Sequence, residues 1–388
     1  MKKKLLALLL CASMLFTVAA CGDDKKEDDN KVTPPSITKL ADYSDFNKVY
    51  TGDYVITNKV ILEGFQELLA SAGVAVEWVE VTDRNVITKD DIVKLDYTGY
   101  LDGEAFSGGS AKDQWISVGK NASVDQTTGA AGSSFIEGFT DGLIGAKVGD
   151  TIRHDVKFPE NYGNESLNGK TTTFEFKIHG IYTMNEYTPE NIDDAFVEKN
   201  LKEYYDVSTV EEVMEYVEEE LRYQAFVGYM VANSTVDIPD SYLESRVDDY
   251  IDFFEEKYCS ETLTLETLLQ YYYGITLEDA RKEWKKGLES QIKVEVIFAE
   301  IVKNDKLALD EEELEEYVQS ILQTEEDETT TSSFFTSKAD IFKYAGSGNK
   351  EVGEQYLLNE IAVKDLIEEK TEGMKPTEDT SETESTEK

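Results

Sequence analysis

Cysteine, histidine and proline are scarce in this sequence, and each shortage narrows the chemistry that it can carry. The 388 residues include three cysteines, two histidines and six prolines. Because Cys11 is expected to leave with an N-terminal targeting sequence and Cys21 to carry a lipid, Cys259 has no intramolecular partner, and a disulfide framework is excluded. We expect Cys259 to be a small buried residue of a helical region rather than a reactive thiol. His154 and His179 lie in strand-like stretches, where structural roles in a sheet are expected over metal or catalytic-triad roles.

Familiar catalytic motifs are missing as well. The sequence contains no Cys-x-x-Cys, His-Glu-x-x-His or Gly-x-Ser-x-Gly motif, no Walker phosphate loop and no dinucleotide fingerprint. Most familiar hydrolases, redox enzymes and nucleotide enzymes therefore lose support. We expect neither a cofactor nor a metal.

Positive charge is also in short supply. The chain has 38 Lys and Arg against 80 Asp and Glu, which gives a formal net charge of -42. Phosphate backbones are bound by clustered basic residues, so nucleic acid is excluded as a partner. An acidic, self-repelling, soluble surface is the expected consequence. Hydrophobic residues make up 40% of the chain and aromatic residues 11%, which is ample for packed cores.

The N-terminus has the pattern of an export signal. Three lysines at positions 2–4 precede a short apolar run over residues 5–16, which is too short to span a bilayer comfortably. Residues 18–22 read VAACG and resemble the bacterial lipobox, in which the cysteine, here Cys21, is lipidated after cleavage. The alternative is an ordinary secretory signal with an unrelated cysteine. Two acyl chains on Cys21 would anchor the protein stably to a membrane. We expect residues 1–20 to be a lipoprotein signal peptide and residues 21–40 a tether.

A short mixed segment over residues 41–84 is followed by two regions with different sequence patterns. In that segment, residues 60–72 predict a helix that stops near Gly73, and residues 74–81 predict a strand. Residues 85–184 alternate apolar and polar positions, most clearly over 92–97 and 173–178, with glycines between these runs. This pattern predicts a β-rich module of about a hundred residues.

Residues 185–370 have helical periodicity. Residues 209–212 read TVEE, which has the spacing of a capping box at a helix start. Apolar stripes predict a helix over about 243–254 and a long helix over about 277–303. Further helices are expected from Asp310 and over about 350–369. Residues 371–388 lack apolar anchors, so we expect a disordered tail.

Several glycine-flanked aromatic motifs occur in the β-rich module. Residues 96–106 read DYTGYLDGEAF, residues 135–145 read FIEGFTDGLIG, and residues 158–163 read FPENYG. In this order they resemble the motifs of FKBP-type prolyl isomerases. The resemblance implies a pocket for an X-Pro peptide lined by Tyr97, Phe106, Phe135, Ile136, Phe139, Tyr162 and Phe174. It places Phe139 at the pocket floor, the backbone N–H of Ile136 toward the substrate carbonyl, and the hydroxyl of Tyr162 toward the peptide. The alternative for these side chains is an ordinary β-domain core.

The resemblance extends to trigger factors over about residues 83–370. It is carried by the sequences DR at 83–84, FSGG at 106–109 and LNGK at 167–170. In the helical half it is carried by VDIP at 236–239 and AEIVKNDKL at 299–307. Residues 36–84 contain no Gly-Phe-Arg-x-Gly-Lys-like ribosome-docking signature, so we do not expect the ribosome as a partner.

The fold implied is α+β. An FKBP-like antiparallel half-barrel sheet wrapped on a helix over 85–184 is followed by an all-helical trigger factor-like arm domain over 185–370. The implied function is a prolyl isomerase and chaperone for unfolded or nascent exported polypeptides at the outer face of the membrane. The alternative is a holdase with a binding-only FKBP-like domain. A solute-binding or adhesion lipoprotein has less support, because the pattern of two α/β lobes is absent.

Some residues depart from the family pattern or leave two interpretations open. Ser107 stands where many members have a carboxylate beside the pocket. The insertion-like loop at 121–134 could cover or reshape the site, and Trp115 is a weaker pocket candidate. The aromatic pairs and runs at 253–254 and 271–273 are either exposed binding surface or, as we expect, helix-packing core.

Overall fold

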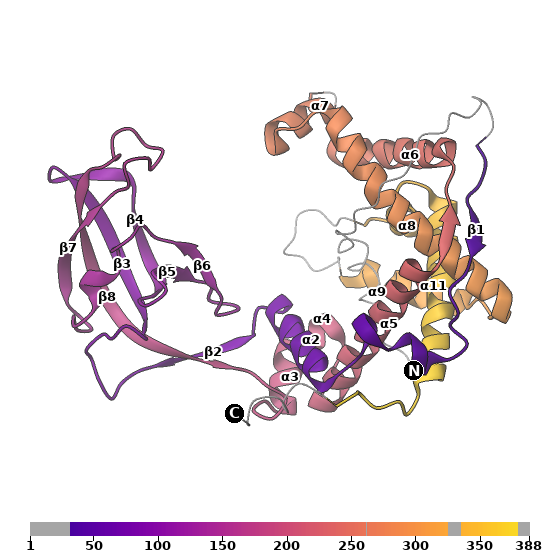
Figure 1. Ribbon diagram of the computed structural model, residues 1–388, viewed down its shortest axis with the longest axis horizontal. Coiled ribbons are helices and arrows are strands. Elements are labelled where there is room, and N and C mark those ends of the chain that lie inside the picture. Colours follow the sequence, from indigo (N-terminus) through magenta and orange to yellow (C-terminus); the bar gives the residue numbers. More distant parts are fainter. Residues whose placement is uncertain (1–31, 261, 325–334, 379–388) are drawn as a thin grey trace, which may run out of the picture. The chain divides into compact units, whose positions relative to one another are not determined.

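The computed structural model describes residues 32–260, 262–324 and 335–378, which form two compact units (Figure 1). One unit covers residues 62–214, and the other combines residues up to 61 with those from 215 onward. The predicted signal peptide, the first part of the predicted tether with Cys21, and residues 379–388 of the predicted tail lie outside the described residues. Among the described helices, none is both long enough and apolar enough to cross a membrane.

The first unit is built on one antiparallel sheet. Its strands are hydrogen-bonded in the order β2-β8-β3-β4-β5-β6, and β7 also pairs with β8. Their bounds are β2 (Val76–Glu80), β3 (Ile92–Leu101), β4 (Glu104–Ser117), β5 (Ala122–Val124), β6 (Ala131–Ser134), β7 (Thr151–Lys157) and β8 (Thr171–Glu186). The strand predicted over 74–81 is confirmed by the slightly shorter β2, and those predicted over 92–97 and 173–178 are confirmed as parts of β3 and β8.

One face of this sheet carries the core of the unit. Alternation along β3 buries Val93 and Leu95, and alternation along β8 buries Phe176 and Ile178. The helix expected against the sheet is only the single 3-10 turn η4 (Asp141–Leu143), with Leu143 buried. This turn lies close to β7, where His154 Nε2 donates to the Gly138 carbonyl at 3.0 Å, a structural role as expected for this histidine.

Three helices also contribute to this unit. They are α2 (Asn58–Ser71), which belongs to it only from residue 62 onward, α3 (Asp194–Asn200) and α4 (Lys202–Tyr205). The predicted helix over 60–72 is confirmed by α2, which buries Phe65 and Leu69 and is followed by Gly73 at φ +75°. Glycine adopts this left-handed conformation without a Cβ clash, so it ends the helix.

The second unit is almost entirely helical. Its helices are α1 (Phe46–Val49), the 3-10 turn η3 (Gly52–Tyr54), α5 (Val210–Asn233), α6 (Asp240–Tyr258), α7 (Leu265–Leu268), the π-helical turn η5 (Leu269–Tyr273), α8 (Leu277–Asp305), α9 (Glu311–Thr324), α10 (Lys338–Ala345) and α11 (Lys350–Thr371). The predicted helices over 243–254, 277–303, from 310 and over 350–369 are all present. The predicted capping box also forms, because Thr209 Oγ1 accepts from Glu212 N at 3.1 Å and Glu212 Oε2 accepts from Thr209 N at 3.2 Å.

The predicted mixed segment over 41–84 is divided between the two units. Its first part joins the helices, because Phe46 stacks on Phe226 of α5 at 5.5 Å and the Tyr50 hydroxyl donates to the Arg222 carbonyl at 3.2 Å. Just before this segment, β1 (Ser36–Lys39) pairs with β9 (Thr235–Asp237), so part of the predicted tether is a strand. These contacts join residues about 170 to 200 positions apart, which local sequence patterns do not reveal.

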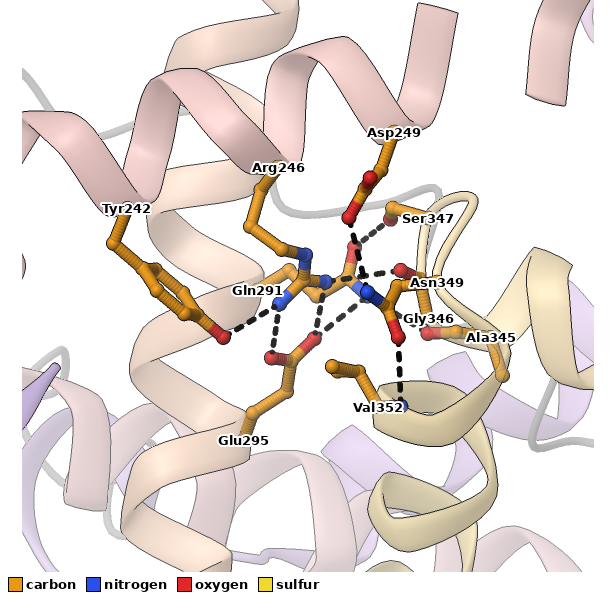
Figure 2. A network of polar contacts seen from close by, with 10 residues as sticks. All are labelled: Tyr242, Arg246, Asp249, Gln291, Glu295, Ala345, Gly346, Ser347, Asn349 and Val352. Carbon is orange, nitrogen blue, oxygen red and sulfur yellow. Dashed lines mark hydrogen bonds and ion pairs between the residues drawn. The ribbon is translucent and has the colours of Figure 1, made fainter. Parts of the chain in front are cut away.

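A buried polar network ties α6 and α8 to the turn before α11 (Figure 2). The Arg246 side chain is only 2% exposed and donates to both carboxylate oxygens of Glu295, at 2.8 and 3.0 Å. It also donates to the Gly346 carbonyl at 3.1 Å, while Gln291 Nε2 donates to the Ala345 carbonyl at 2.8 Å. Buried charges need partners of this kind, so the network holds three segments in one arrangement.

Residues 371–378 of the predicted disordered tail include a helix end and hydrogen bonds to the rest of the unit. Thr371 is the last residue of α11, and Met374 accepts from Arg222 at 2.9 Å through its carbonyl. Thr377 forms a bridge with Thr57 and donates to the Ile56 carbonyl at 2.8 Å. Backbone pairing therefore extends the ordered chain past 371.

Candidate functional site

Phe139 lies at the centre of an aromatic cluster in the β-rich unit. It is 2% exposed, and its ring meets those of Tyr97, Phe174 and Phe176 edge-on at 5.2, 4.9 and 5.1 Å. Phe135 stacks nearly parallel on it at 4.4 Å. These are favourable ring geometries. The predicted floor of the pocket is therefore a packed ring, with Phe135 lying on it.

Phe106 reaches the same cluster from β4 because two neighbouring positions lack side chains. A Cβ on Gly99 would lie 2.6 Å from the Phe106 ring and 2.8 Å from the Phe174 ring, and a Cβ on Gly109 would lie 2.4 Å from the Phe106 ring. Only glycine permits this approach. Phe106 then meets Phe174 at 5.9 Å and Phe158 at 6.0 Å.

Two tyrosines, Tyr97 and Tyr162, lie near each other at the edge of the cluster. Tyr97 is half-buried, and burial together with the neighbouring Tyr162 raises the pKa of its hydroxyl. Tyr162 is 48% exposed, and its ring packs edge-on against Phe158 at 4.6 Å. The cluster thus has an apolar body with polar ends that reach water, an arrangement suited to an apolar ligand with peptide groups attached.

The backbone at residues 135–136 is anchored by the side chain of Asn121. Asn121 Nδ2 donates to the carbonyls of Phe135 and Ile136 at 3.1 and 3.0 Å. Its Oδ1 accepts from the Thr140 hydroxyl at 3.1 Å. The N–H of Ile136 has no acceptor among the described residues. This leaves a donor beside the aromatic cluster for a ligand carbonyl.

All seven predicted site residues belong to this one hydrophobic cluster or its rim. Phe139 and Phe174 are buried, Tyr97, Phe106, Phe135 and Ile136 are half-buried, and Tyr162 is exposed. Their individual roles remain predictions. Sequence reasoning missed Asn121, Phe158 and Phe176. Phe158 lies within the FPENYG motif, and the alternating pattern of β8 places Phe176 beside Phe174, so both could have been found. Asn121 carries no comparable signal.

Two predicted possibilities are corrected by the structure. Trp115 lies outside the aromatic cluster and packs instead on Trp78 at 4.7 Å and Tyr182 at 4.3 Å. The loop over 121–134 contributes the paired strands β5 and β6, and Gln126 near its tip accepts from Trp78 Nε1 at 2.8 Å. The loop therefore extends the sheet, and its tip contacts β2. The ring that lies on Phe139 belongs to Phe135, which directly follows the loop. Ser107 beside Phe106 is exposed.

The aromatic residues at 253–254 and 271–273 of the helical unit, expected in a core, differ in their exposure. Tyr271, Tyr272 and Tyr273 are 79, 67 and 65% exposed, contrary to the expected core role, because the π-helical turn η5 at the α7 end of the α6–α8 pair carries them into solvent (Figure 1). Phe253 is 5% exposed, as expected for core. Cys259 directly follows α6 and is half-buried rather than buried as expected, and burial together with the neighbouring Glu255 raises the pKa of its thiol.

Comparison with known proteins defines the class of the β-rich unit. Residues 84–179 match the family model described as FKBP-type peptidyl-prolyl cis-trans isomerase, close to the predicted bounds of 85–184. The unit is an FKBP-type domain.

The helical part also matches a family model. Residues 199–341 match the model described as bacterial trigger factor protein C-terminus. The chain therefore carries an FKBP-type domain followed by a trigger factor C-terminal domain, and it is trigger factor-like as predicted.

Individual relatives agree with this assignment. The trigger factor of Shouchella clausii is 29% identical over 250 residues, which cover 62% of this chain and 54% of the relative. That of Clostridium beijerinckii is 31% identical over 248 residues, or 61% of this chain and 53% of the relative. That of Macrococcus caseolyticus is 27% identical over 353 residues, or 88% of this chain and 74% of the relative.

The chain spans about half the length of the first two of these relatives. A solved structure of a trigger factor chaperone aligns over 88% of this chain and 80% of its own, with 16% identity and a TM-score of 0.31.

Proposed function

We propose that this protein is a prolyl cis/trans isomerase and chaperone that assists the folding of exported polypeptides while anchored to the membrane through Cys21. The observation that carries the isomerase part is the aromatic cluster around Phe139, with the Ile136 N–H and the Tyr162 hydroxyl at its edge. The match of residues 84–179 to FKBP-type isomerases supports the same conclusion.

The proposed chemistry requires no nucleophile and no proton transfer. An X-Pro amide rotates over a barrier of about 20 kcal/mol because rotation breaks its resonance. The twisted amide is less polar than the planar one, so apolar surroundings favour it over the ground state. Phe106, Phe135 and Tyr97 would hold the proline ring, while the Ile136 N–H and the Tyr162 hydroxyl would hold the flanking carbonyls in the turned conformer.

The helical unit would supply the holding activity. Its trigger factor C-terminal match supports binding of unfolded chains, and the exposed tyrosines at 271–273 offer aromatic surface for it. The location at the outer face of the membrane rests on the N-terminal sequence alone. We expect the protein to become labelled when the bacterium that produces it is grown with labelled palmitate. We expect this label to be lost in Cys21→Ala. Equal labelling of Cys21→Ala would contradict the anchor.

Isomerase activity is tested by acceleration of a refolding reaction limited by X-Pro isomerisation. Tyr162→Phe removes only an exposed hydroxyl, and one lost hydrogen bond predicts about a two- to tenfold lower kcat/KM. Tyr100→Phe is the matched control, because Tyr100 lies on β3 but faces Arg153, whose guanidinium is 5.5 Å from its ring. A rate that is equal in both variants would remove Tyr162 from the site.

The holdase alternative draws on the stacking of Phe135 over the buried Phe139. If wild-type protein leaves the slow refolding phase unchanged but suppresses aggregation of an unfolded test protein, the domain binds without catalysis. Acceleration at catalytic concentrations, with saturation in substrate, excludes this alternative.

A further inference from the structure

Three metal-ligating side chains from three neighbouring strands meet on the side of the sheet away from the aromatic cluster. Asp96 belongs to β3, Asp113 to β4 and His179 to β8. Successive strand residues face opposite sides, and Leu95 and Tyr97 face the core, so Asp96 faces outward. His179 Nε2 lies 3.0 Å from Asp96 Oδ1, and the Asp113 N–H donates to the same oxygen at 2.9 Å.

Irregular strand pairing produces this convergence. Along β8, Lys94 pairs with Gly180 and Leu95 with Ile178, so His179 is an extra residue in the register. Along β4, the register shifts in the same way opposite Asp96, where two residues stand against one. Such bulges redirect side chains. One bulge lies on each of the two strands that neighbour β3, and both lie beside Asp96. Together they turn His179 and Asp113 toward a single point.

The geometry and chemistry of the three groups suit a transition-metal cation. Each residue offers one ligand atom, and the three atoms lie within 4.8 Å of one another. Zn²⁺ with ligands at about 2.0–2.2 Å needs separations of about 3.3 Å, and a small rotation of the 71% exposed Asp113 side chain can close the difference. Two carboxylates balance the charge of a divalent ion, while the imidazole favours Zn²⁺ over Mg²⁺ and Ca²⁺.

We propose that Asp96, Asp113 and His179 form a Zn²⁺-binding site with its remaining coordination positions open to water. One cationic group already competes for it, because Lys94 Nζ lies 3.1 Å from Asp113 Oδ1. Lys177 is also near Asp96. Bound Zn²⁺ replaces the Lys94 ion pair and links β3, β4 and β8 directly behind Tyr97. The site is independent of the isomerase proposal.

The chain is well suited to a direct test because it has only two histidines. Full-length protein with all three cysteines replaced by serine, so that no thiol competes, is labelled with [¹⁵N]histidine and titrated with Zn²⁺. The His179 ring resonances are expected to shift and to saturate at one Zn²⁺ per chain. The His154 ring, whose Nε2 faces the Gly138 carbonyl, is the internal control and is expected to stay unchanged.

Two further variants predict opposite effects. Asp113→Asn removes an exposed ligand and is expected to abolish saturable binding, with an unchanged melting temperature in EDTA showing an intact fold. Lys94→Gln removes the competing amine and is expected to tighten binding. Three results would each overturn the site. They are His179 ring resonances that do not shift in excess Zn²⁺, equal shifts of the His179 and His154 rings, and undiminished Zn²⁺ binding by Asp113→Asn. A response to Mg²⁺ or Ca²⁺ but not Zn²⁺ would overturn the assigned metal class.

Discussion

Glu360 makes the stability of the helical unit depend on pH in a direction unusual for a carboxylate. It lies on α11 with 0% exposure, and the Tyr223 hydroxyl donates to its Oε1. Burial raises the pKa of Glu360 to about 7, from an ordinary value of 4.5; Lys364, Tyr223 and Tyr356 oppose this rise and Glu220 adds to it. The folded state therefore holds a proton that the unfolded chain has already lost.

The sign and size of the effect follow from proton linkage. Between about pH 4.5 and 7 the folded protein binds one proton more at this position, so its stability falls as pH rises. A rise of roughly 2.5 units at 1.36 kcal/mol each corresponds to about 3 kcal/mol lost by pH 8. Glu360→Gln imitates the protonated side chain at every pH. It should match wild type near pH 5 and exceed it by up to about 3 kcal/mol at pH 8.

Urea unfolding across pH 5–8 measures this difference. With Trp78 and Trp115 replaced by phenylalanine, Trp284 on α8 is the remaining tryptophan and reports unfolding of the helical unit. Glu351→Gln is the control, because Glu351 is exposed in the first turn of the same helix and its difference from wild type should stay flat. A flat difference for Glu360→Gln as well would refute the reasoning.

Two other predictions concern buried polar contacts. Glu295→Ala leaves Arg246 buried without its carboxylate partner and should destabilise the helical unit by about 3–5 kcal/mol in urea unfolding. Glu283→Ala removes only an exposed pair with Lys286, so it should cost less than about 1 kcal/mol, and equal losses would contradict the role of burial. Asn121→Ala removes the donors to the carbonyls of residues 135 and 136, so it should slow isomerisation of a peptide substrate while the domain stays folded by circular dichroism. An unchanged rate would show that those carbonyls need no support.

Local patterns predicted most elements because their causes are local. The stripe over 277–303 became α8, and the TVEE sequence formed its capping box at the start of α5. Strand alternation placed Leu95 in the core of the sheet. The glycine-flanked aromatic motifs placed all seven candidate residues in one cluster or on its rim. Side-chain periodicity and capping depend on residues a few positions apart, so one sequence suffices to detect them.

The boundary between the two units, at residues 61–62, lies at a place that local sequence patterns did not indicate. Phe46 packs on Phe226, and this contact assigns the start of the described chain to the helical unit rather than to a separate segment. The Tyr271–Tyr273 run was expected in a core, yet the π-helical turn exposes it. A run of aromatic residues has the same composition in either setting, and only the surrounding packing distinguishes them.

By itself, the sequence determined the kind of protein, a β-rich isomerase-like module followed by a helical half, together with the set of aromatic residues at its candidate site. Tertiary structure alone decided how closed that site is, because Phe135 stacks on Phe139 only once the sheet has formed. It also decided that His179 meets Asp96 and Asp113, since the register shifts beside β3 set which residues of neighbouring strands lie side by side. Both outcomes depend on contacts between strands distant in sequence, which side-chain periodicity does not encode.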